Sequence, residues 1–278
     1  MKIGRFAGEN GAFWAVLNLD EGTCRPLEGG FSSWAPALTG DPGSAARLAG
    51  EPQPLAGLRT LAPVEPTAKI VAVGATYAKH VAGLGLTMPE RPAAFLKPYG
   101  SLLAPGAEIS YPALTSALDY EAELVAVIGA ASIDRSAPSR SVLGYTAGND
   151  VSARDLQFGG SVTGMDMFSA KALDATGGVG PWIVTRDEFG DDHPDLELRL
   201  TVNGEVRQSD RTSSMAWGVG DLVEYVEARS ALACGDVLFT GTSAGVGHED
   251  GRYLEPGDVV EVTIERIGTL RNTVGPRP

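Results

Sequence analysis

Two glutamates, Glu121 and Glu123, stand before an apolar run in the stretch DYEAELVAVIG at residues 119–129. Because side chains alternate between the faces of a strand, both carboxylates point the same way, and Val125 and Val127 continue that face into apolar surroundings. Two such charges, about 6–7 Å apart, repel by about 2.5 kcal/mol at an effective dielectric constant near 20. The pair is therefore either a solvated strand end or two oxygen ligands of a divalent cation.

A third carboxylate, Asp150, ends the strand-like segment VLGYTAGND. An Asn-Asp pair after Gly is often simple turn chemistry. Together with Glu121 and Glu123, however, Asp150 would complete a set of hard oxygen ligands of the kind that suits Mg²⁺, Mn²⁺ or Ca²⁺. Three protein carboxylates would leave coordination positions for water and substrate.

Lys171 lies in the segment FSAKALDATGG. A single lysine is usually a solvated surface charge, but the chain holds only five Lys beside 17 Arg. Near three carboxylates, a lysine could act as a proton carrier or as an electrostatic partner.

The segment GTSAG at residues 241–245 matches the G-x-S-x-G pattern of serine hydrolases. That pattern marks a turn from a strand into a helix, whereas here it is followed by VGHEDGRYLEPGD, which Gly and Pro interrupt. A serine hydrolase with His248 as its base is therefore disfavoured. No Rossmann glycine triplet and no GK[ST] motif occurs, so those modes of nucleotide binding are also disfavoured.

The composition limits the possible partners of the 278-residue chain. Hydrophobic residues make up 43% and charged residues 21%, which is typical of a globular protein, and the net charge of −13 disfavours a nucleic acid or an anionic membrane. An anionic substrate would then need local positive charge. No run approaches the ~18 apolar residues of a membrane span, so we expect a cytoplasmic protein. Cys24 and Cys234 form no CxxC pair, and three His make a His-rich metal site improbable.

The predicted elements indicate an α+β protein that is mainly β. Short strands and Gly-rich turns come first, followed by a helix at residues 44–50, and Pro63 and Pro66 mark a boundary. We therefore predict a small α+β N-terminal domain, residues 1–66, and a catalytic domain, residues 67–278. In the second, strand patterns outnumber helical ones, and the clearest helix spans residues 221–232 with Asp221 as its N-cap.

In order along the chain, these pieces resemble the fumarylacetoacetate hydrolase family. The resemblance runs from about residue 69 to the C-terminus, and its most specific part is the E-x-E pattern followed by NDVSARDLQ. The first ~65 residues are similar to the variable N-terminal domain of such proteins. The other matching segments are VAVGATYAKH, PAAFLKPYGSLLAPG, AKALDATGGVGPWIVT, VNGEVRQ, GDVLFTGTSAGVG and LEPGDVVEVTIERIG.

The resemblance implies a mixed β-roll catalytic domain that forms a homodimer. It also implies that Mg²⁺ or Mn²⁺ is held by Glu121, Glu123 and Asp150. The resemblance further implies that Lys171 lies beside the metal and that the side chains of Arg154 and Gln157 contact the substrate. Thr242 would hold the substrate through its backbone N–H, and His80 would be the acid/base residue on a mobile segment.

The implied substrate is a small 2-oxo or 1,3-dicarbonyl acid. Such a compound would chelate the cation, which stabilises an enolate during C–C cleavage of the acylpyruvate or fumarylpyruvate type. Isomerases, tautomerases, decarboxylases and dehydratases of 2-oxo acids would use the same site. A catalytically silent binding protein with this fold is the alternative from another class.

One departure from the family pattern concerns the histidine segment. Many members read G-x-N-Y-x-x-H-x-x-E, in which the Glu helps the His to activate water, but this chain has Thr76 for the Asn and Gly83 for the Glu. Glu90 in the following loop is the candidate replacement. Without a water-activating pair, tautomerisation or decarboxylation becomes relatively more favoured than hydrolysis.

Overall fold

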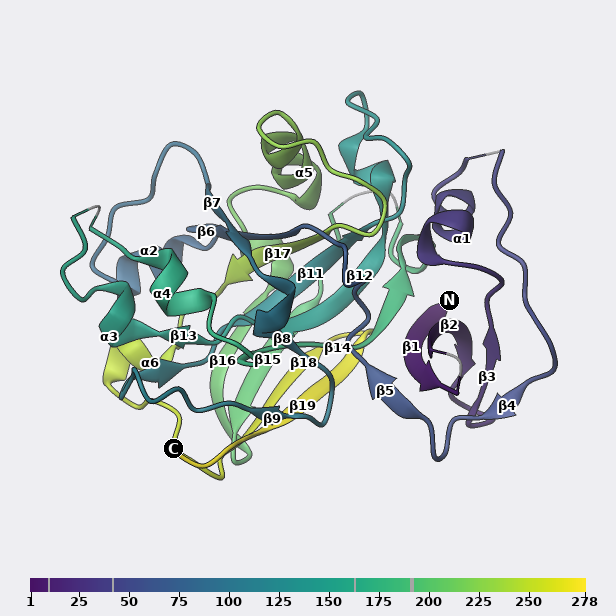
Figure 1. Ribbon diagram of the computed structural model, residues 1–278. Helices are drawn as coiled ribbons and strands as arrows, with labels where there is room; N and C mark the ends of the chain where they lie inside the picture. The colour runs from purple at the N-terminus through teal and green to yellow at the C-terminus, as the bar shows by residue number, and fades with distance from the viewer. Residues whose placement is uncertain (10, 42, 163, 191–192) are drawn as a thin grey trace.

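The computed structural model describes residues 1–9, 11–41, 43–162, 164–190 and 193–278. Within these ranges strands predominate over short helices (Figure 1), so the prediction of an α+β fold that is mainly β is confirmed. Parallel and antiparallel strand pairs both occur in the largest sheet.

The largest sheet has twelve strands, and its main path runs in the order β4-β3-β2-β1-β14-β12-β11-β17-β6-β7, with β5 paired to β1 and β8 paired to β14. Its strands are β1 (Lys2–Gly8), β2 (Gly11–Asn18), β3 (Thr23–Pro26), β4 (Gln53–Pro54), β5 (Arg59–Leu61), β6 (Ile70–Gly74), β7 (Ala93–Lys97), β8 (Leu102–Leu103), β11 (Ala122–Ile128), β12 (Val142–Asn149), β14 (Gly177–Thr185) and β17 (Val237–Thr242).

A second sheet packs against the first through the main hydrophobic core. It contains β16 (Glu205–Arg211), β15 (Glu197–Val202), β18 (Val259–Ile264), β19 (Gly268–Val274) and β9 (Glu108–Ile109), in that order. The strands β10 (Leu118–Asp119) and β13 (Ser152–Ala153) form a separate two-stranded sheet. Leu124 of β11, Leu198 of β15 and Val262 of β18 belong to one buried cluster, so apolar side chains of both sheets fill the space between them.

Strand β11 is buried on both faces. Leu124, Ala126 and Ile128 face the core between the sheets, whereas Val125 and Val127 belong to a second cluster on the other face. This double burial explains the continuous apolar run in the sequence. It also places the carboxylates at its start next to a dry interior.

The N-terminal segment continues the large sheet, because β1 pairs with β14. Figure 1 shows β1, β2 and β3 curling together beside α1 (Phe31–Leu38). Trp14, Phe31 and Trp34 pack there with ring centroids 4.7–5.8 Å apart. The division at residue 66 stays a prediction.

The helix predicted at residues 44–50 is wrong. Leu48 forms a β-bridge with Leu27, and the carbonyl of Arg47 accepts a hydrogen bond from the N–H of Glu28. Seven residues are too short to form a stable helix without strong packing, so extended pairing with the neighbouring segment prevails.

Helix α5 (Val219–Glu227) replaces the longer helix predicted at residues 221–232. Its N-cap is Gly218 rather than Asp221. The carboxylate of Asp221 instead accepts the N–H of Gly218 at 2.9 Å, so it supports the same helix start from the third helical position.

Four very short helices gather at one end of the molecule (Figure 1). They are α2 (Ala78–Gly83), α3 (Arg154–Gln157), α4 (Met167–Lys171) and α6 (Gly247–Asp250). In the described part of the chain, no helix combines the length and the apolar character needed to cross a membrane.

Gly144 of β12 tests the close packing of the large sheet. An added Cβ would lie 2.2 Å from the carbonyl oxygen of Val184, a backbone atom of the neighbouring strand. Gly144→Ala should therefore destabilise the protein by about 1–3 kcal/mol in urea unfolding. Gly220→Ala in α5 is the matched control, since its Cβ would meet only ordinary contacts at 3.6 Å, and it should be neutral or slightly stabilising. Equal effects of both changes would contradict this packing.

Candidate active site

A cavity of about 390 Å³ lies where β11, β12 and β17 approach the short helices. Its wall contains all eight residues to which the family resemblance assigns a role: His80, Glu121, Glu123, Asp150, Arg154, Gln157, Lys171 and Thr242. The fold therefore brings together residues that lie up to 162 positions apart in the chain.

Three buried carboxylates form the centre of the site. Glu121, Glu123 and Asp150 each offer an oxygen, and these oxygens lie within 4.8 Å of one another. Strand pairing explains the arrangement, because Ala122 is the register partner of Asn149 and the N–H of Asp150 donates to the carbonyl of Glu121 at 2.9 Å. The end of β12 thus carries its carboxylate to the start of β11.

Two buried lysines balance part of this negative charge. Lys171 of α4 donates to Glu121 at 2.5 Å and to Asp150 at 2.7 Å. Lys97, at the end of β7, lies 2.6 Å from the other oxygen of Asp150 and also donates to the carbonyl of Lys171. Both ammonium groups are buried, so their attraction to the carboxylates is only weakly screened by water.

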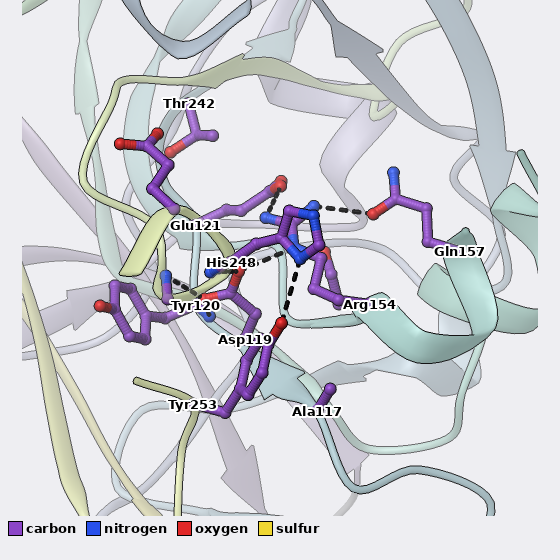
Figure 2. Close-up of polar contacts among 12 residues, drawn as sticks. Ala117, Asp119, Tyr120, Glu121, Arg154, Gln157, Thr242, His248 and Tyr253 are labelled. Atoms are coloured by element: carbon purple, nitrogen blue, oxygen red, sulfur yellow. Dashed lines mark hydrogen bonds and ion pairs between the residues drawn. The ribbon is translucent and has the colours of Figure 1, made fainter. Parts of the chain in front are cut away.

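Arg154 joins the acidic centre to a second buried carboxylate. Its guanidinium donates to Asp119 at 2.7 Å, to Glu121 at 2.6 Å and to Gln157 at 2.8 Å. Figure 2 shows Gln157 turned toward Arg154. Asp119 also accepts the N–H groups of Gly247 and His248, so it fixes the start of α6 as well. One carboxylate therefore positions both Arg154 and the α6 segment.

The two glutamates differ in their ionisation. Burial raises the pKa of Glu121, but Lys171 and Arg154 outweigh burial and hold that pKa at about 2. Burial raises the pKa of Glu123 well above its ordinary value, and the nearby charges of Asp150 and Glu121 raise it further. Glu123 has no direct cationic partner among the described residues, and its Oε2 accepts only the N–H of Gly241, at 2.7 Å. A buried carboxyl held in this way fits a site for one further cation.

The donor set matches a hard divalent cation. Three carboxylates within reach of one another suit Mg²⁺ or Mn²⁺, which prefer oxygen ligands. The residues that would hold the ion are thus Glu121, Glu123 and Asp150, the set expected from the sequence.

His80 of α2 faces Glu249 of α6. Its Nδ1 is buried and lies 3.6 Å from a carboxylate oxygen of Glu249, slightly beyond a normal hydrogen bond. A Cβ added at Gly83 would lie 2.7 Å from the same carboxyl group. Glu249 therefore fills the space that a glutamate at position 83 would need.

The sequence suggested Glu90 as the replacement for that glutamate, but the structure places Glu249 beside His80. Glu90 is exposed and is not part of the cavity wall among the described residues. Glu249 is held by the N–H of Gly245, which donates to its second oxygen at 3.0 Å. The partner of His80 thus comes from a remote segment and not from the loop that follows it.

The GTSAG segment forms a support for the acidic centre. Thr242 Oγ1 donates to the carbonyl of Ala122 at 2.9 Å and accepts from Gln208 at 2.8 Å. Gly241 adopts φ +94°, and a Cβ there would lie 2.1 Å from the hydroxyl oxygen of Thr76, so a glycine is required for its N–H to reach Glu123. Ser243 is buried, and its hydroxyl contacts Gln208 and Ala244, while His248 contacts Tyr253. The serine-hydrolase alternative therefore gains no support.

Sequence reasoning missed Lys97, Asp119 and Glu249. Lys97 had a usable signal, because it is one of five lysines and lies in the matching segment PAAFLKPYGSLLAPG. Asp119 stands two positions before Glu121 and follows the same alternation. Glu249 had no local signal, since it meets His80 only through the packing of α6 against α2.

Comparison with known proteins agrees with the motifs. A family model described as "Fumarylacetoacetate (FAA) hydrolase C-terminal" matches residues 69–275, and one described as "Rv2993c-like, N-terminal" matches residues 1–63. The chain therefore belongs to the fumarylacetoacetate hydrolase family.

Similar proteins include hydrolases and an isomerase. The 2,4-didehydro-3-deoxy-L-rhamnonate hydrolase of Sphingomonas sp. (strain SKA58) is 35% identical over 99% of this chain and 96% of its own. The crystal structure of 5-carboxymethyl-2-hydroxymuconate delta-isomerase from Mycobacterium smegmatis has a TM-score of 0.81 and 38% identity over 99% of this chain and 100% of that one. Fumarylpyruvate hydrolase from Pseudomonas aeruginosa, solved with Mn²⁺ and pyruvate, has a TM-score of 0.68 and 32% identity over 78% and 92%. These relatives support an enzyme, and the Mn²⁺ of the fumarylpyruvate hydrolase structure, together with the three clustered carboxylates of this chain, supports binding of a divalent metal.

The unequal surroundings of the two glutamates lead to a test in the metal-free protein. Glu121→Gln should cost about 3–5 kcal/mol in urea unfolding with EDTA, because it deprives buried Lys171 and Arg154 of a charged partner. Glu123→Gln should change stability by less than about 1 kcal/mol, because a neutral amide can still accept the N–H of Gly241. A loss from Glu123→Gln as large as that from Glu121→Gln would contradict this distribution of charge.

Proposed function

We propose that the protein is a divalent-metal-dependent enzyme that cleaves a C–C bond in a small 2-oxo or 1,3-dicarbonyl acid of the acylpyruvate or fumarylpyruvate type. The observation that carries the proposal is one cavity lined both by the three clustered carboxylates and by His80, whose Nδ1 lies 3.6 Å from Glu249. The first group suits binding of the cation, and the second suits activation of water.

The metal would be held by Glu121, Glu123 and Asp150. When bound, Mg²⁺ or Mn²⁺ supplies a Lewis acid for the two chelating oxygens of the substrate. Lys171 keeps two of the ligand carboxylates in place through its contacts with Glu121 and Asp150. The lysine also adds positive charge to the cavity, which favours entry of an anion into a protein with a net charge of −13.

The remaining residues of the polar wall would orient the substrate. Gln157 accepts from Arg154 through its Oε1 and turns its amide nitrogen toward the sulfur of Met167 at 3.6 Å. A hydrogen bond from this amide to a substrate oxygen would replace a weak contact with a strong one. Arg154 already binds two carboxylates, so its main contribution is to position Glu121 and Gln157.

His80 and Glu249 would handle the protons of the reaction. Glu249 faces Nδ1, so a proton on that nitrogen leaves Nε2 free to accept a proton from water. Cleavage consumes one water: its hydroxyl joins the acyl carbon as the C–C bond breaks, and a proton joins the carbon that becomes the methyl group of pyruvate. Apo distances of this kind often shorten when substrate binds.

An isomerase or tautomerase is the second candidate, favoured by the similarity to the Mycobacterium smegmatis isomerase. Its reaction would need His80 to move a proton between carbon and oxygen without the addition of water. Decarboxylases and dehydratases of 2-oxo acids would use the same cavity.

The homodimer and the cytoplasmic location remain predictions, and light scattering that gives twice the chain mass would support the dimer.

Turnover of acetylpyruvate and fumarylpyruvate with Mg²⁺ or Mn²⁺, followed by chromatography of the released pyruvate, tests the proposal. His80→Asn should reduce kcat by about 10²–10⁴-fold, and Glu249→Gln should also reduce it, because both remove part of the proton-transfer pair. Glu90→Gln is the matched control and should leave the rate unchanged. Interconversion of enol and keto forms without pyruvate release would favour the isomerase, whereas no reaction with any of these acids would favour the silent binding protein.

A further inference from the structure

The cavity wall is divided into a charged part and an apolar part. The charged part contains three carboxylates that lie close together, Glu121, Glu123 and Asp150. It also contains two cations, Lys171 and Arg154, that contact them. Much of the remaining wall is apolar. β6 and β7 supply small residues and Phe95, and the rest comes from α2, the loop that follows it and the segment that leads into and starts α4: Val81, Leu84, Leu86, Pro89, Met165 and Met167. A ligand anchored at the acidic centre would therefore extend along apolar side chains.

Among the described residues, the wall contains one lysine and one arginine, and both already bind carboxylates. Lys171 contacts Glu121 and Asp150, and Arg154 contacts Asp119 and Glu121. Lys79 and Arg91 flank the apolar segment in the sequence, but neither belongs to the wall. A second carboxylate at the far end of a substrate would thus find no unpaired lysine or arginine among the described residues of this wall.

Two side chains of the apolar wall are unusually exposed for their type. Leu86 is 44% exposed and Met165 is 37% exposed, although both line the cavity. Removing such surface from water is favourable, so an apolar group of the substrate would be stabilised where these side chains lie.

We infer that the substrate has a single anionic end, which binds the divalent cation that the acidic centre would hold, and an uncharged, apolar acyl group that covers Leu84, Leu86 and Met165. This inference rests on the proposed function and narrows it to acylpyruvates with a neutral acyl group, rather than compounds with a second carboxylate such as fumarylpyruvate. A buried carboxylate without a partner is strongly disfavoured, whereas each buried methylene adds to affinity.

Calorimetric titration of the Mg²⁺-loaded protein with three 2-oxo acids tests the inference. Pyruvate reports the anchoring end, and 2-oxohexanoate and 2-oxoadipate have the same number of carbons but end in a methyl group and a carboxylate, respectively. We expect 2-oxohexanoate to bind more tightly than pyruvate, by roughly fourfold for each methylene that becomes buried. It should also bind at least about tenfold more tightly than 2-oxoadipate. Equal or tighter binding of 2-oxoadipate would overturn the inference.

A charge placed in the apolar wall should reverse this preference. Leu86→Arg should tighten 2-oxoadipate relative to 2-oxohexanoate by at least about tenfold, because the new cation can pair with the second carboxylate. Leu114→Arg is the matched control: it changes the net charge equally at a position that is 70% exposed and outside the wall, so the ratio should stay as in the wild type. Met165→Lys serves the same purpose if Leu86→Arg does not fold. An unchanged ratio in a folded wall variant that still binds pyruvate would also overturn the inference.

Binding of pyruvate distinguishes a failure of this inference from a failure of the proposed function. If pyruvate binds but the preference for the apolar tail is absent, only the inference about the substrate fails. If none of the three acids binds to the metal-loaded protein, the proposed function fails, and the inference falls with it.

Discussion

The structure depends on the balance of charge among four buried carboxylates. Asp119, Glu121, Glu123 and Asp150 meet at the ends of β10, β11 and β12, and three buried cations, Lys97, Lys171 and Arg154, lie among them. Four negative groups against three positive ones leave one carboxylate without a partner, and an unpaired buried charge is costly. The contacts assign that position to Glu123, whose carboxylate accepts the N–H of Gly241 and has no cationic partner within ion-pair distance among the described residues. Burial beside Asp150 and Glu121 also raises its pKa. Stability without metal and readiness to bind metal thus come from the same arrangement.

This balance explains why so much of the chain is needed for one cavity. Three of the carboxylates lie at or next to the ends of β11 and β12, which are buried on both faces. Of their cationic partners, Lys97 comes from β7, whereas Lys171 and Arg154 come from short helices that have little stability of their own. Asp119 illustrates the coupling, because it binds Arg154 of α3 and also fixes the start of α6, which carries Glu249. The position of the histidine partner therefore depends indirectly on the same charge network that forms the candidate metal site.

The sequence predicted the centre of the site better than its surroundings. Alternation along one strand was enough to place Glu121 and Glu123 on a common face, and the end of the next strand pattern supplied Asp150. Glu249 could not be found in this way, because its contact with His80 depends on tertiary packing around Gly83 and not on local spacing. The helix predicted at residues 44–50 failed for a related reason, since pairing of Leu48 with Leu27 outweighs weak local helix propensity.

The most direct test of this account is the unfolding temperature with EDTA, with Mg²⁺ or Mn²⁺, and with the metal plus oxalate, which imitates the chelating end of a 2-oxo acid. The account predicts a stepwise rise. A ligand at about 100 times its Kd adds roughly 2.7 kcal/mol, which corresponds to several degrees at about 2–4 °C per kcal/mol. An unfolding temperature that responds to neither metal nor oxalate would contradict the central claim that Glu121, Glu123 and Asp150 form a metal site.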